Sequence, residues 1–211
     1  MDLFSQVDDF LGTALLEQDA ALDGALERST AAGLPPIAVS PLQGKMLHLL
    51  VRMCGARHVL EVGTLGGYST IWLARAAGSV TTLELDEKHA AVARENLAAA
   101  GLTNVSVIVG PALETLPTLT ETVDFAFIDA DKGNNPRYVE HVLRLSRPGT
   151  VIVVDNTVRQ GRVADDSLTD ADVLGTRELF ELLRSDQRVD ATTIQTVGLK
   201  GHDGFTLCLV R

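Results

Sequence analysis

The stretch "RHVLEVGTLGGYSTIWLARAAGSVTTLEL", residues 57–85, decides the fold class of this chain. It contains a short apolar run at 57–62, a glycine-rich turn that leads into a helical segment at 67–78, and a second apolar run at 79–85. Short, nearly continuous apolar runs are typical of strands buried on both faces. A strand, a helix and another strand in this order predict a parallel β-α-β unit.

The same alternation continues toward the C-terminus, with three further apolar runs at 104–109, 123–128 and 150–154. The helix between the second and third runs is the clearest, because Asp86 suits its N-cap and Gly101 its end. The fifth run leads into a longer irregular stretch. We therefore expect an α/β fold with a largely parallel sheet and helices on both faces.

Two elements depart from this alternation. The last apolar runs, 189–197 and 205–210, are separated only by "GLKGHDG", which is too short for a crossover helix. They should form an antiparallel pair. Near the N-terminus, 2–33 and 41–55 each have the pattern of an amphipathic helix. We expect one domain, 1–211, in which a helical layer (1–56) forms a lid or a dimer surface on a core (57–211).

Composition narrows the class of protein. The chain has 211 residues, 45% of them apolar, with no apolar run near the roughly 20 residues that cross a bilayer. Because "MDLFSQVDDF" has no basic region followed by an apolar core, a secretory signal is not expected. Its two cysteines match no metal-ligand spacing and are expected to be free thiols in a reducing cytoplasm. The formal charge of −10, with no basic stripe, argues against binding nucleic acid.

Ligands of open α/β sheets bind beyond the carboxyl ends of the strands. The first strand ends in "LEVGTLGGYS", where Gly63 opens a tight turn, and the second ends at Glu84, which could accept both hydroxyls of a ribose. A dinucleotide pyrophosphate would be repelled by Glu61, whereas a ligand with an amine and a sulfonium tolerates a carboxylate. This favours S-adenosylmethionine over NAD, although the glycine turn by itself could serve only helix–sheet packing.

The third strand ends in Gly110, Pro111 and Ala112, which are small enough to leave a flat slot for an adenine ring. Pro111 is equally well explained as the first residue of a helix.

Carboxylates and an amide follow the fourth and fifth strands, in "IDADKGNN" and "VVDNTV". Each motif alone could be a helix cap or a turn. Together they place Asp129, Asp155 and Asn156 at neighbouring strand ends, and two carboxylates with one amide oxygen suit Mg²⁺. The five histidines show no paired spacing, which argues against zinc.

Lys132 follows Asp129 at the start of a predicted helix, where the helix dipole disfavours a cation. Such a local mismatch is expected at functional positions. A neighbouring divalent cation would favour the neutral amine, which could accept a proton from a hydroxyl. The alternative is a solvated lysine beside Asp131 acting as an N-cap.

Several motifs in order resemble one known family. They are "SPLQGKMLHLLV", "EVGTLGGYST", "LELDEKHAAVARENLAAAGL", "GPALETLP", "DFAFIDADKGNNPRY", "GTVIVVDNTVRQGRV" and "DGFTLCLVR". The chain is similar to the cation-dependent O-methyltransferases of the caffeoyl-CoA and catechol type, in their compact bacterial form. The resemblance implies a Rossmann-like class I methyltransferase sheet of seven strands with a reversed last strand, in a homodimer.

The resemblance also implies roles for individual residues. Metal ligands would be Asp129, Asp155 and Asn156, with Lys132 as the base and Glu84 on the cofactor ribose. The remaining cofactor contacts would be Val39, Glu61, Gly63, Thr64, Ser69, Ala112 and Asp131. The implied reaction is transfer of a methyl group from S-adenosylmethionine to a small aromatic molecule with two adjacent hydroxyls, such as a catechol, hydroxycinnamate or flavonoid. It would depend on Mg²⁺, with Ca²⁺ or Mn²⁺ left open.

The chain departs from the plant caffeoyl-CoA enzymes at Arg159 and Gln160, where those enzymes carry Trp-Asn, so plant-type substrate contacts are not expected. We predict that 160–172 is a mobile loop bordering the substrate and that Arg159 meets an acidic substituent. An exposed connection without a role is the alternative. Two rival functions are a nucleotide-dependent oxidoreductase and a non-catalytic cofactor-binding protein.

Overall fold

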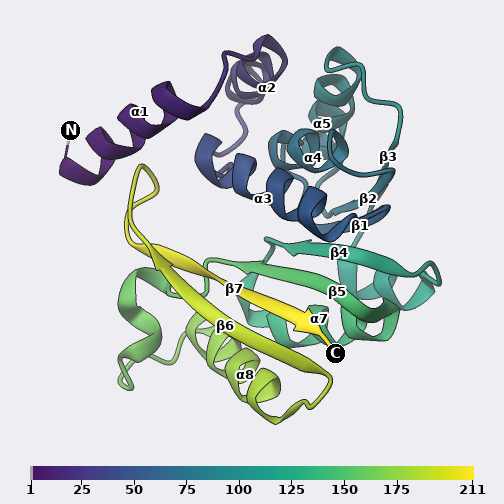
Figure 1. The fold of residues 1–211 in the computed structure, drawn as a ribbon, viewed down its shortest axis with the longest axis vertical. Coiled ribbons are helices and arrows are strands. Elements are labelled where there is room, and N and C mark those ends of the chain that lie inside the picture. Colours follow the sequence, from purple (N-terminus) through teal and green to yellow (C-terminus); the bar gives the residue numbers. More distant parts are fainter. Residues whose placement is uncertain (1) are drawn as a thin grey trace.

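Seven strands form one sheet in the order β3-β2-β1-β4-β5-β7-β6 in the computed structural model, which describes residues 2–211 (Figure 1). The first five strands pair in parallel, and β7 runs antiparallel to both β5 and β6. The strands are β1 (His58–Val62), β2 (Ser79–Glu84), β3 (Val105–Val109), β4 (Val123–Ile128), β5 (Ser146–Asp155), β6 (Val189–Thr196) and β7 (Asp203–Val210). The predicted seven-stranded α/β sheet with a reversed last strand is confirmed.

Helices cover both faces of this sheet (Figure 1). The α-helices are α1 (Leu3–Leu15), α2 (Ala20–Ala31), α3 (Pro41–Cys54), α4 (Tyr68–Ala74), α5 (Glu87–Ala99), α6 (Ala112–Thr115), α7 (Asn135–Leu145) and α8 (Ala171–Ser185). Three short 3₁₀ helices are η1 (Leu116–Thr118), η2 (Lys132–Asn134) and η3 (Arg159–Ala164). Within residues 2–211, none of the helices has the length and apolar character to cross a membrane.

Alternate residues of each strand point to opposite faces, so the sheet has two cores. Leu60 of β1 and Ile128 of β4 pack on one face with residues of α7 and α8. Val59 and Phe127, one position away in each strand, pack on the other face with residues of α2, α3, α4 and α5. Burial on both faces explains why these strands lack a polar alternation.

The N-terminal segment 2–33 is two helices, so the expectation of one helix was wrong. α1 ends at Leu15, and Asp19 starts α2 by accepting hydrogen bonds from the backbone N–H groups of Ala21 and Leu22. Asp19 also pairs with Arg75 of the core at 2.5 Å. The Asp19 carboxylate both caps α2 and pairs with the core residue Arg75. These two contacts determine where α1 and α2 are separated, because α2 begins at the residue that is tied to the core.

The stretch after β5 is also more regular than predicted. Its first part forms η3, and α8 follows with Asp170 as its N-cap, accepting from the N–H of Val173 at 3.3 Å. Arg177 donates hydrogen bonds to the carbonyl groups of Val163, Asp165 and Leu168, which fastens 163–168 onto α8. A helix of 15 residues therefore lies where the sequence predicted irregular chain.

Candidate active site

The ends of β4 and β5 bring the predicted metal ligands together. Ile128 of β4 pairs with Val154 of β5, so Asp129 and Asp155 leave the sheet side by side. Asn156 follows in a left-handed conformation with φ of 55°, and the N–H of Thr157 donates to the carbonyl of Gly204 in β7. The turn that carries the amide is thus held by the reversed last strand.

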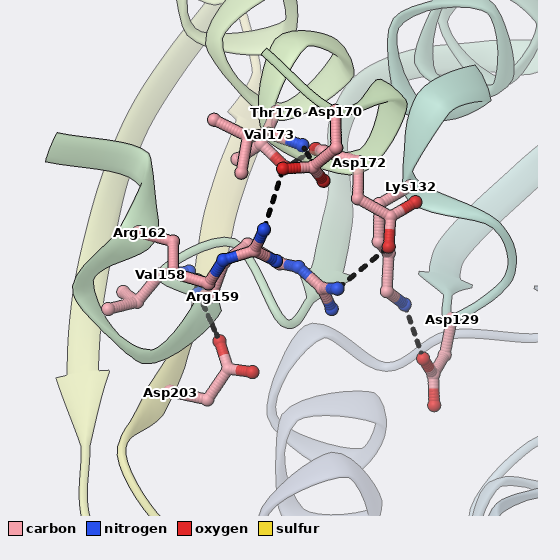
Figure 2. Close-up of polar contacts among 10 residues, drawn as sticks. All are labelled: Asp129, Lys132, Val158, Arg159, Arg162, Asp170, Asp172, Val173, Thr176 and Asp203. Atoms are coloured by element: carbon pink, nitrogen blue, oxygen red, sulfur yellow. Dashed lines mark hydrogen bonds and ion pairs between the residues drawn. The ribbon is translucent and has the colours of Figure 1, made fainter. Parts of the chain in front are cut away.

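Charge at this edge is concentrated and buried. Asp155 is only 5% exposed, and its burial together with the charge of Asp129 raises its pKa above that of an ordinary carboxyl group. The Nζ of Lys132, itself buried, lies 2.6 Å from Oδ1 of Asp129. The predicted base and the predicted ligand therefore form an ion pair (Figure 2).

The donor set fits a hard divalent cation. Two neighbouring carboxylates that repel each other, one of them buried, gain from a cation between them, and carboxylate and amide oxygens are the ligands Mg²⁺ prefers. Among residues 2–211 no three His, Cys, Asp or Glu side chains cluster in a way that could hold a metal. A cation at Asp129 and Asp155 would thus need a neutral further ligand, the role predicted for Asn156.

The glycine turn after β1 touches the same edge. Gly63 has φ of 99°, and a Cβ atom built on it would lie 2.1 Å from the carbonyl oxygen of Asp129. Glu84, at the end of β2, accepts hydrogen bonds from the N–H groups of Thr64 and Leu65 at 3.1 and 2.7 Å. One carboxylate therefore shapes the turn on which the cofactor was predicted to bind.

Three side chains predicted to contact the cofactor take part in a buried hydrogen-bond network. Glu61 has no exposed surface, and its carboxylate accepts hydrogen bonds from the hydroxyls of Ser69, Thr70 and Thr82 at 2.6, 2.5 and 2.7 Å. The hydroxyl of Thr64 lies 2.6 Å from that of Thr82. Burial raises the pKa of Glu61 to about 7. This network supports the turn from below, and side-chain contact of these residues with a cofactor stays a prediction.

The other predicted cofactor residues lie around the same strand ends. Val39 is buried in the connection before α3, and Ala112 begins α6 beside Glu84, whose carbonyl accepts from the N–H of Gly110. The carboxylate of Asp131 accepts from the hydroxyl of Tyr138 at 2.5 Å. Burial, and next the contact with Asp131, raise the pKa of Tyr138. Their contacts with a cofactor also stay predictions.

A cavity of about 220 Å³ adjoins the acidic edge. Phe205, which pairs with Asp155 across β5 and β7, forms part of its wall. So does Gln43 of α3, whose side chain hydrogen-bonds to Asp155 and lowers its pKa. Leu42, Met46 and Val197 add apolar surface. No role was predicted for Gln43, although it lies in the motif "SPLQGKMLHLLV".

Comparison with known proteins shows the family to which the chain belongs. A family model described as O-methyltransferase matches residues 16–211, almost the whole chain. The chain belongs to the O-methyltransferase family. Catechol O-methyltransferase of Mycobacterium tuberculosis is 54% identical over 210 residues, which cover 97% of this chain and 95% of that protein. Catechol O-methyltransferase of Niastella koreensis is 46% identical over 217 residues, 99% of this chain and 98% of that one.

Solved O-methyltransferases share the fold. The enzyme from Bacillus cereus in complex with SAH has a TM-score of 0.97 and 50% identity, covering 99% of this chain and 98% of that chain. TomG from Streptomyces achromogenes, in complex with SAM, has a TM-score of 0.95 and 47% identity. The match covers 98% of this chain and 96% of that chain. This O-methyltransferase therefore has the class I methyltransferase fold, as predicted, and the alternatives of an oxidoreductase and a non-catalytic protein were wrong.

Proposed function

We propose that this O-methyltransferase uses S-adenosylmethionine and Mg²⁺ to methylate one hydroxyl of a small aromatic molecule with two adjacent hydroxyls. The observation that carries the proposal is the pair of carboxylates, the buried Asp155 and the partly exposed Asp129, beside the buried Lys132 and an apolar cavity. The names of the relatives, catechol O-methyltransferase in two bacteria, agree with this acceptor class.

In this proposal Asp129, Asp155 and Asn156 hold the cation, and the two carboxylates neutralise its charge. A bound Mg²⁺ supplies Lewis acidity that favours an ionised acceptor hydroxyl. Lys132, as the neutral amine that a cation bound at the neighbouring Asp129 would favour, would take the proton from that hydroxyl. The oxygen then forms a bond to the methyl carbon as the carbon–sulfur bond of the sulfonium breaks.

The cavity gives the acceptor its place. Gln43 and Phe205 link its wall to Asp155, and apolar side chains suit the face of an aromatic ring. The turn at Gly63 and the carboxylate of Glu84 lie on the opposite side of Asp129 and are proposed to hold the cofactor. Cofactor and acceptor would thus meet at the edge that carries the metal.

Mass spectrometry tests the reaction. The protein is incubated with S-adenosylmethionine and a panel of catechols, hydroxycinnamates and flavonoids, with Mg²⁺ or with a chelator, and products heavier by one methylene are sought. Asp155→Ala should abolish the product, whereas Asp166→Ala, at an exposed position in the same stretch of chain, should not. Wild-type rates in the Asp155 variant, or equal rates with the chelator, would rule out the proposed metal site.

We also propose a homodimer in which α1 contributes to the interface. No residue of α1 is buried, and Leu3, Phe4, Phe10 and Leu15 are between 52 and 71% exposed. Figure 1 shows α1 at the edge of the molecule. A contiguous apolar helix face of this kind is typical of an interface. Light scattering of the Phe10→Glu variant, which should be monomeric, tests the proposed dimer interface.

A cytoplasmic location also remains a proposal, to which the two free cysteines are suited.

A further inference from the structure

Arg159 leaves the acidic edge with its backbone held in a strained conformation. Its φ is 55°, and those of Asn156 and Gln160 are 55° and 60°. Side chains other than glycine adopt this region at a cost. The carboxylate of Asp203 accepts hydrogen bonds from the N–H groups of Val158 and Arg159 at 3.2 and 2.9 Å, which keeps the segment in this shape. The direction of the Arg159 side chain is therefore set by the end of β5 and the start of β7.

The guanidinium of Arg159 is only partly paired. Its Nη2 donates to Oδ2 of Asp172 at 2.7 Å, with side-chain exposures of 23% for Arg159 and 39% for Asp172. Its Nε is buried and has no hydrogen-bond partner among the described residues. A guanidinium presents donors in a fork that matches a carboxylate, and a buried donor without an acceptor is costly. The N–H groups that Asp172 leaves unpaired on this partly exposed guanidinium can therefore donate to a second anion.

α8, whose first turn carries Asp172, packs tightly on η2, which begins at the proposed base. A Cβ atom on Gly175 would lie 2.5 Å from the carbonyl oxygen of Lys132 and 2.6 Å from the Cα of Gly133. The hydroxyl of Thr176 donates to the carbonyl of Asp172, which continues the same turn. Figure 2 shows the Arg159 guanidinium directed toward the carboxylate of Asp172.

We propose that Arg159 and Asp172 form a pair that selects acceptors by charge, favouring rings that carry a carboxylate. This inference rests on the proposed function and names the acceptor more closely. The carboxylate of the acceptor would bind the accessible N–H groups of the guanidinium that Asp172 leaves unpaired. Asp172 offsets part of the guanidinium charge and so limits the preference for anions.

Two matched acceptors test the pair: 3,4-dihydroxybenzoate and its methyl ester, which share the diol and differ in charge. The ratio of their kcat/KM values should fall about tenfold or more in Arg159→Gln, the size expected for a charge-assisted hydrogen bond. It should rise in Asp172→Asn, where the guanidinium loses its counter-charge. Arg162→Gln is the control, because Arg162 pairs with Asp170 at 2.7 Å in the same segment.

Equilibrium binding of 3,4-dihydroxybenzoate to the protein saturated with S-adenosylhomocysteine gives a readout independent of turnover. Weaker binding in Arg159→Gln but not in Arg162→Gln supports the pair, even if neither acceptor is methylated, a result that would instead count against the proposed function. An unchanged acid-to-ester ratio with unchanged binding in Arg159→Gln overturns the inference. Equal losses in Arg159→Gln and Arg162→Gln overturn it as well, because they would assign the effect to folding of η3.

Discussion

Gly63 and Asp129 approach each other so closely that a Cβ atom on Gly63 would lie 2.1 Å from the carbonyl oxygen of Asp129. The N–H of Asp129 also donates to the carbonyl of Val62 at 2.8 Å. The proposed cofactor turn and the proposed metal edge are therefore one rigid unit, in which a change on one side displaces the other.

Replacing Gly63 by alanine should disturb both the proposed cofactor turn and the proposed metal edge. The new methyl group would collide with backbone, and alanine disfavours φ of 99°, so we expect a loss of stability on the order of 3 kcal/mol and weaker binding of S-adenosylhomocysteine. Gly149→Ala is a matched control: Gly149 has φ of 93°, but its Cβ would meet no atom within 4 Å. Urea unfolding and calorimetry measure the two effects. Equal losses in both variants would show that φ alone matters.

Lys132 can be tested separately as a charge and as a base. Lys132→Arg keeps a cation beside Asp129 but cannot take a proton at neutral pH, whereas Lys132→Ala removes both properties. If Lys132 is the base, both variants should lose turnover by roughly 10²- to 10⁴-fold and lose the rising limb of the pH–rate profile. A pH–rate profile unchanged from wild type in either variant would exclude Lys132 as the base.

The raised pKa of Glu61 predicts that the stability of the folded protein depends on pH. Its pKa rises from the ordinary 4.5 to about 7 in the folded protein because of burial, so between these values the folded state holds a proton that the unfolded state has released. The free energy of unfolding should therefore fall as pH rises through this window, with a share from Glu61 on the order of 3 kcal/mol.

Glu61→Gln should remove that share, since the amide can still bond to the surrounding hydroxyls without a charge. Urea unfolding of the ligand-free protein at several pH values measures the slope, and Glu95→Gln, at an exposed position of α5, should leave it unchanged. A slope in Glu61→Gln equal to that of wild type would contradict the assignment.

Asp8 joins α1 to the hairpin between β6 and β7, at the wall of the cavity. Its Oδ2 accepts from the N–H of Leu199 at 2.8 Å, and Gly198 leaves no room beside it for a side chain. Asp8→Ala should raise the KM for the acceptor roughly fivefold, the equivalent of about 1 kcal/mol for one hydrogen bond, without changing the KM for S-adenosylmethionine. Asp9→Ala, on the exposed side of the same helix, serves as the control. Equal changes in both variants would contradict a role for this contact.

The structure also explains why two sequence expectations were wrong. Segment 2–33 has the apolar pattern of one helix, but Asp19 pairs with Arg75, which is distant in sequence, and caps a second helix there. α8 has a glycine in its interior, at Gly175, which weakens its helical signal. That glycine is required because the backbone of η2 lies against it. Both features depend on contacts between distant segments, which a local pattern does not contain.

The succession of strands along the chain and the residues at the strand ends followed from the sequence by itself, because burial on both faces leaves nearly continuous apolar runs and parallel strands bring their carboxyl ends to one edge. That placed Asp129 beside Asp155. The tertiary structure alone decided where the side chains around them point: Glu61 into the core, Gln43 to Asp155, and Arg159 to Asp172. Hydrogen bonds between residues distant in sequence depend on how the helices pack on the sheet. The periodicity of the sequence is local and does not determine that packing.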